Sequence, residues 1–147
     1  MARKFPLQTL LDLSQSHADA AAKSLLVLKV RWHEAEEKFK QLLAYRESYR
    51  ERLRDLASSA AAMRDFQLFM VKLDTAIKLQ QDEVARCQAR WNAGQQEWLR
   101  QRGKVKAYDA LSARHKRAEE KREELVEQKE QDEFANKQDQ GRRNEGE

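Results

Sequence analysis

The residues of this 147-residue sequence that could carry acid–base or metal chemistry are few and scattered. Its histidines, His17, His33 and His115, lie far apart along the chain, and Cys87 is its single cysteine. His33 and Glu37 would share one face of a helix, which is half of a metal site, but a solvated pair is the simpler interpretation. We expect no metal, no cofactor and no catalytic residue, because catalysis needs groups that converge in a water-excluding pocket.

The composition explains why no such pocket is expected. The chain is 40% hydrophobic and 37% charged, with one proline and four glycines. Average globular chains are about 45–50% apolar and about 25% charged, so little core is available. A β-sandwich or an α/β fold needs turn residues roughly every ten positions, and their scarcity excludes both classes. A lone cysteine also excludes an internal disulfide and mildly favours a reducing compartment.

The charge distribution predicts an acidic partner. Residues 1–114 carry 21 Lys and Arg against 14 Asp and Glu, whereas residues 115–147 carry 8 against 11. A basic body with an acidic tail suits an acidic protein surface or nucleic acid. The longest aliphatic run has four residues, at 25–28, far short of a signal or a membrane span. We therefore expect a soluble, cytoplasmic protein without direct membrane insertion.

Two heptad patterns, here called the first and the second seam, predict an all-α coiled coil. The first seam is Leu7, Leu11, Ser14, Ala18, Ala21, Leu25, Leu28, Trp32, Ala35, Phe39, Leu42, Arg46, Tyr49, Leu53 and Leu56. The second seam is Met63, Phe66, Met70, Leu73, Ile77, Gln80, Val84, Cys87, Trp91, Gly94, Trp98, Gln101, Val105 and Tyr108. Beyond Tyr108 the rhythm weakens to Leu111, Ala118 and Leu125.

The two seams are out of phase, so the apolar stripe changes sides between them. This favours a long antiparallel two-helix hairpin over a long parallel dimer. We expect one domain over residues 1–135, with helices at 7–56 and 65–134 and a turn at 57–64. Ser58, Ser59 or Asp65 would cap the second, longer helix. Residues 115–133 would lack a partner helix, and the polar end, 136–147, should be disordered.

Folding back near residue 61 predicts the interhelix register, because facing positions then have numbers that sum to about 122. Trp32 would meet Trp91, and Leu28 would meet Gly94, so a large side chain lies opposite a small one, as close packing requires. By the same rule Leu25 faces Trp98, Ala18 faces Val105, and Leu7 lies opposite His115.

Three further features suggest partners or specificity. Residues 86–117 carry nine Lys and Arg against two acids, which fits an acidic protein surface, a solvated face or, with less support, nucleic acid. Phe69, Leu73, Ala76 and Gln80 form an apolar stripe that leans off the seam, so Phe69 and Ala76 should be partly exposed, either as a wider seam or as a partner groove. Arg46 is the one charged residue of the first seam. It could determine the register of the two helices and the choice of partner, or its guanidinium could simply extend to water.

Five short segments stand out beside the seams. They are Phe5-Pro6-Leu7 near the start, Tyr45 with Tyr49-Arg50, Phe66-Gln67 with Phe69, Leu73 and Ala76-Ile77, Trp98-Leu99 with Arg102, and Asp132-Glu133-Phe134-Ala135. In this order the chain resembles the FliJ family, the small coiled-coil component of the bacterial flagellar type III export ATPase complex. The resemblance covers almost the whole chain and implies a hairpin similar to the stalk of the rotary ATPase γ subunit.

The resemblance also implies partners: the export ATPase hexamer, the cytoplasmic domain of the export gate, and export chaperones, at the inner face of the cell membrane. The gate-binding face would be Phe69, Leu73, Ala76 and Gln80, although the family often has a larger polar ring at the last position. Contacts to the ATPase ring would come from the paired chain ends, at Leu7, Arg102, Lys106, Arg114 and Phe134. The family's loop commonly contains glycine, which is absent from 57–64. The alternatives are a homodimeric coiled-coil scaffold and a basic nucleic-acid binder.

Overall fold

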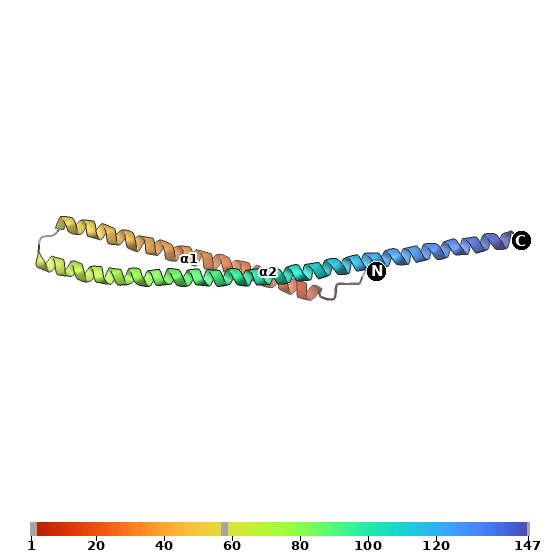
Figure 1. The fold of residues 1–147 in the computed structure, drawn as a ribbon, viewed down its shortest axis with the longest axis horizontal. Helices are drawn as coiled ribbons and strands as arrows, with labels where there is room; N and C mark the ends of the chain where they lie inside the picture. Colours follow the sequence, from red (N-terminus) through yellow and green to blue (C-terminus); the bar gives the residue numbers. More distant parts are fainter. Residues whose placement is uncertain (1–2, 57–58, 147) are drawn as a thin grey trace. The chain divides into compact units, whose positions relative to one another are not determined.

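The computed structural model describes residues 3–56 and 59–146. It contains two helices, α1 (Gln8–Leu56) and α2 (Ala60–Glu145), and no strand among these residues (Figure 1). The predicted all-α hairpin with a longer second helix is confirmed, since α1 has 49 residues and α2 has 86. The parallel-dimer alternative needs one unbroken helix, whereas α1 ends at Leu56 and α2 begins at Ala60.

The start of α2 is capped by a serine. The backbone N–H of Ala62 donates to Ser59 Oγ at 3.1 Å, and the N–H of Met63 donates to the Ser59 carbonyl at 3.2 Å. This is an N-cap, and it confirms Ser59 among the predicted caps; Ser58 lies outside the described residues. The predicted helix start at 65 was five residues late, because alanines such as Ala60 are the strongest helix formers and extend the helix back to the cap.

The chain divides into two compact units. The hairpin unit comprises Ala18–Gln101, and the terminal unit comprises the residues up to His17 and from Arg102 onward. The single domain expected over residues 1–135 stays a prediction.

In the hairpin unit the two helices run side by side in opposite directions (Figure 1). Every described seam position of this unit is buried or half-buried except Met63. The indole rings of Trp32 and Trp91 lie 5.4 Å apart between centroids. A Cβ built on Gly94 would approach Leu28 Cδ1 to 2.7 Å, so Leu28 packs directly against Gly94 and would have to shift if a larger residue stood there. Both contacts confirm the predicted register.

In the terminal unit the buried and half-buried line of side chains mixes apolar residues, such as Leu11, Val105 and Tyr108, with polar ones. Ser14, Val105 and Glu119 are buried, and Ser112 and His115 are half-buried. The seam thus continues by steps of three and four. Leu111, Ala118 and Leu125, where the apolar pattern of the sequence weakens to a step of seven, lie off this line and are all exposed.

From residue 120 onward every described residue is exposed, yet α2 continues to Glu145. The structure therefore differs from the disordered tail that the sequence predicted from residue 136. The polar composition removes packing partners but not local helix propensity, because Glu, Lys, Gln and Arg are good helix formers and opposite charges support a helix at i, i+4 spacing.

Candidate docking surfaces

An aromatic cluster joins α1 and α2 where the two helices approach the turn. Phe69 lies against Tyr49 and Tyr45, with ring centroids 4.4 and 6.1 Å apart, and Phe66 stacks on Tyr49 at 5.2 Å with parallel planes. These rings come from seam positions and their immediate neighbours, so the coiled-coil geometry brings them together. Phe69 is half-buried, and Tyr45 leaves about half of its surface exposed.

The predicted gate-binding stripe leans toward the interhelix seam rather than away from it. Leu73 is buried, and Phe69, Ala76 and Gln80 are half-buried. Gln80 Nε2 donates to the backbone carbonyl of Ala35 on α1 at 2.9 Å. The partial exposure expected of Phe69 and Ala76 is present, but most of the stripe's surface faces α1.

A groove beside the aromatic cluster has a volume of about 390 Å³. It is lined by Tyr49, Arg52, Leu53, Ala62, Asp65 and Phe66. The groove is open to solvent and combines an apolar floor with one cation and one carboxylate, which suits a side chain of a partner rather than a small substrate.

Arg46, the charged position of the first seam, reaches across to α2. Its Nε lies 3.2 Å from Asp74 Oδ1, although the N–H is not aligned for a hydrogen bond. The two side chains are partly exposed, so water screens this ion pair and its net contribution to stability is small. A role of Arg46 in register or partner choice stays a prediction.

Two cations of the basic stretch are paired within α2. Arg86 and Arg100 each contact a glutamate three residues earlier, Glu83 and Glu97, at 2.7 Å. The hydrogen bonds from Arg86 and Cys87 lower the pKa of Glu83. Burial, followed by the bond to Glu83, raises the pKa of the Cys87 thiol, which makes the cysteine a poor nucleophile and consistent with the predicted core position.

The terminal unit holds the residues predicted to contact an ATPase ring. Arg102, Lys106 and Arg114 are exposed on α2, Phe134 is 64% exposed, and Leu7 is half-buried just before α1. Four of the five are therefore accessible, and the structure distributes them along α2 rather than gathering them in a pocket.

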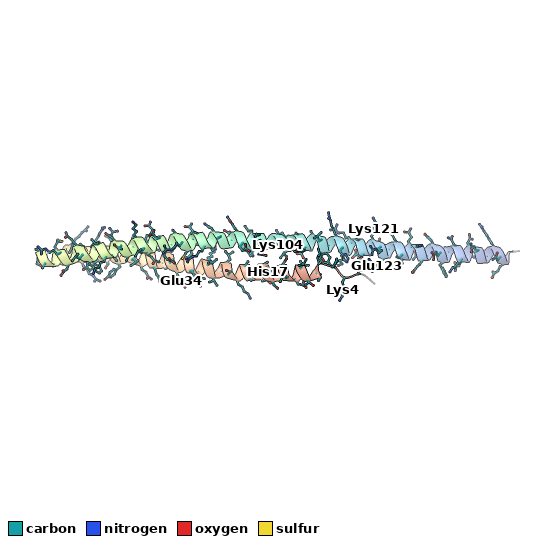
Figure 2. All side chains as sticks on the ribbon, turned by 90° about the horizontal axis from the view of Figure 1, so that it is seen from below. Lys4, His17, Glu34, Lys104, Lys121 and Glu123 are labelled. Carbon is teal, nitrogen blue, oxygen red and sulfur yellow. The ribbon has the colours of Figure 1, made fainter. Side chains whose placement is uncertain are left out.

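The first residues of the chain are tied to α2 within the terminal unit. His115 Nε2 lies 2.8 Å from the carbonyl oxygen of Arg3, to which it donates, and the rings of Phe5 and His115 have centroids 5.6 Å apart. Nearby, Leu10, Leu13, His17, Lys104 and Tyr108 line an open groove of about 340 Å³, and Figure 2 shows His17 and Lys104 on the two different helices. The sequence reasoning missed this groove, because Leu10 and Leu13 lie beside the seam.

The described part of the chain offers neither a metal site nor a membrane-spanning helix. Residues 3–56 and 59–146 hold no group of three His, Cys, Asp or Glu side chains placed to bind a metal ion, and His33 and Glu37 gain no third ligand. Neither helix contains a stretch long and apolar enough to span a bilayer.

Comparisons with known proteins agree on one family. The family model described as "Flagellar FliJ protein" matches residues 3–144. The chain is 29% identical over 138 residues to the flagellar FliJ protein of Salmonella typhi, an alignment that covers 92% of this chain and 94% of that protein. It is 28% identical over 138 residues to the flagellar FliJ protein of Escherichia coli strain K12, with the same coverage. The similarity therefore extends through both units.

Proposed function

Because the chain belongs to the flagellar FliJ family, we propose that it is a non-enzymatic component of the flagellar protein export apparatus. The family match along residues 3–144 is the observation that carries this proposal. The hairpin supports it, since two packed helices with open, shallow grooves suit binding to other proteins better than chemistry on a small substrate.

We propose further that the terminal unit binds the hexameric export ATPase and promotes its assembly and activity. Arg102, Lys106 and Arg114 offer three exposed positive charges on α2 to an acidic surface, and Phe134 offers an exposed ring. The helix beyond residue 119 has no intramolecular packing to lose when it binds, because its described side chains are already exposed.

Adding the purified chain to the export ATPase tests this proposal. We expect the rate of ATP hydrolysis to rise, and the rise to disappear when Arg102, Lys106 and Arg114 are all changed to Glu. The matched control changes Arg31, Lys38 and Arg50, which are exposed cations of the hairpin unit, to Glu. Absence of both binding and stimulation by the unmodified chain would refute the proposal, and equal loss in both triple variants would point to net charge alone.

The proposed contact with the export gate uses Phe69, Leu73, Ala76 and Gln80. The accessible edge of Phe69 lies next to exposed Tyr45, so the gate would bind a mixed surface made by both helices rather than a free stripe on α2. Phe69→Leu keeps apolar volume in the cluster but removes the ring. We expect weaker binding to the cytoplasmic domain of the gate with little change in melting temperature; unchanged binding would remove Phe69 from the interface.

The family resemblance also leads us to propose that the chain binds export chaperones and works at the inner face of the cell membrane through these partners. Fractionation of cells with and without the export gate tests the location. Recovery of the chain with the membrane only when the gate is present is the expected result, and membrane recovery in both strains would contradict a location set by the gate.

A further inference from the structure

The outer face of α2 in the hairpin unit carries an apolar stripe that the seam does not use. Leu68, Val71 and Leu79 are 63%, 65% and 61% exposed. With Thr75 they follow the spacing i, i+3, i+7 and i+11, which places all four on one face of the helix. We call these four residues the outer stripe. Large aliphatic side chains lined up in solvent are unusual on a surface that has no partner.

Thr75 does not interrupt the apolar character of the outer stripe. Its Oγ1 donates to the backbone carbonyl of Val71 at 3.0 Å, within the same helix. The hydroxyl proton is thus already used, and the methyl group of Thr75 remains available for apolar contact. Next to it, Arg64, Gln67, Leu68 and Val71 line a shallow hollow of about 330 Å³.

Between Leu68 and Leu79 the charged residues are two lysines and one aspartate, Lys72, Lys78 and Asp74. Arg64, Lys72 and Lys78 lie at helical spacing beside it, and among the described residues none of the three has a carboxylate within ion-pair distance. Of the acids in the same segment, Asp74 pairs with Arg46 on α1, whereas Asp65 and Asp82 lie beyond the two ends of the outer stripe. The central part of the outer stripe is therefore flanked by the charges of Lys72 and Lys78.

We propose that the outer stripe is a docking site for an amphipathic helix of a partner protein, whose apolar face is flanked by Asp and Glu. A helix fits because three turns of α2 present apolar side chains at the spacing that a second helix packs against. Acidic flanks fit because they would pair with Arg64, Lys72 and Lys78. A second copy of this chain fits poorly, since antiparallel pairing centred on Thr75 sets Lys72 of one copy against Lys78 of the other.

This inference does not depend on a role in export, because the outer stripe consists of other residues and lies on a different face of α2 from Phe69, Leu73 and Gln80. Two synthetic helical peptides of about 18 residues can probe it on the full chain. Both carry leucines at the spacing i, i+3, i+7 and i+11; one has Glu on the flanks and the other has Lys. Binding is measured by fluorescence anisotropy at low salt. We expect the acidic peptide to bind about tenfold more tightly than the basic one, from three partly exposed ion pairs.

Leu79→Gln is the decisive variant, with Leu99→Gln as its matched control. Both leucines are exposed on α2 in the hairpin unit, so neither change should alter the melting temperature. Leu79→Gln should weaken binding of the acidic peptide about tenfold, because one leucine's burial is lost, whereas Leu99→Gln should leave it unchanged. The double variant Lys72→Glu, Lys78→Glu should reverse the preference between the two peptides.

Three outcomes would overturn the proposal. The first is equal affinity for the acidic and basic peptides, and the second is equal loss of binding in the Leu79 and Leu99 variants. The third is self-association, detected by analytical ultracentrifugation, that disappears in Leu79→Gln; it would assign the outer stripe to a second copy of the chain instead.

Discussion

The hairpin unit and the terminal unit use the same two helices but fill their seams differently. In the hairpin unit large apolar side chains dominate the seam, and the paired rings of Trp32 and Trp91 and the contact of Leu28 with Gly94 lock the two helices in one register. In the terminal unit the corresponding line is mixed: Leu11, Val105 and Tyr108 share it with Ser14, Ser112, His115 and Glu119 before α2 loses its partner.

The difference indicates which part supplies stability and which part is free to adapt. Burial of apolar surface is the main favourable term in folding, so the hairpin unit should hold most of the free energy of unfolding. The more polar seam of the terminal unit contributes less and can exchange its contacts for those of a partner at little cost. If so, a substitution in the hairpin seam should cost more stability than a comparable one in the terminal seam.

Trp91→Ala should have the largest effect. Removing a half-buried indole that packs on Trp32 is expected to lower the free energy of unfolding by about 3 kcal/mol, measured by urea titration followed by circular dichroism. Tyr108→Ala, its counterpart in the terminal unit, should cost about 1 kcal/mol, because its surroundings are more polar and more open. Equal costs at the two positions would remove the contrast between the units.

The glycines of α2 offer a finer test. Gly103 has open space around it, so Gly103→Ala should stabilise the chain by about 1 kcal/mol through helix propensity. Gly94→Ala gains the same propensity but places a Cβ 2.7 Å from Leu28 Cδ1, which must move. We expect the Gly94 variant to be about 1 kcal/mol less stable than the Gly103 variant in thermal unfolding. Identical melting temperatures would show that Leu28 can move aside without cost and that the two helices are not closely packed at Gly94.

Arg46→Met tests whether the charge in the hairpin seam matters. The ion pair with Asp74 is partly exposed and Asp74 can be solvated, so the free energy of unfolding should change by less than about 1 kcal/mol. The near-ultraviolet circular dichroism of the Trp32–Trp91 pair should be preserved. If the variant instead forms dimers in ultracentrifugation, Arg46 acts in partner choice rather than as an ordinary seam residue.

Removal of residues 120–147 should have the smallest effect on stability. Every described side chain in this segment is exposed, so the free energy of unfolding should change by less than about 0.5 kcal/mol. The helical signal at 222 nm should fall, because the removed residues are helical. A large drop in the midpoint would mean that this segment packs on the rest of the chain in solution.

The sequence predicted the seam of the hairpin unit almost residue by residue. It placed Trp32 against Trp91 and Leu28 against Gly94, because heptad spacing and the sum rule for an antiparallel pair need only the order of residues. The candidate site was predicted less well. The family resemblance supplied the four gate residues, but periodicity did not reveal that Gln80 would bond to the Ala35 carbonyl and that Phe69 would join an aromatic cluster with α1.

By itself the amino-acid sequence determined the all-helical class and the seam positions, because hydrophobic periodicity decides which face of each helix is buried. It favoured a reversal of direction near residue 60 over one unbroken helix, and the break between α1 and α2 decided between them. Only the tertiary structure decided how side chains next to the seam divide between core and solvent. That division depends on how the two helices lie against each other, which is a property of the packed pair and not of either helix alone. It turned Phe69 toward Tyr45 and Tyr49 of α1 and left Leu68, Val71 and Leu79 in solvent.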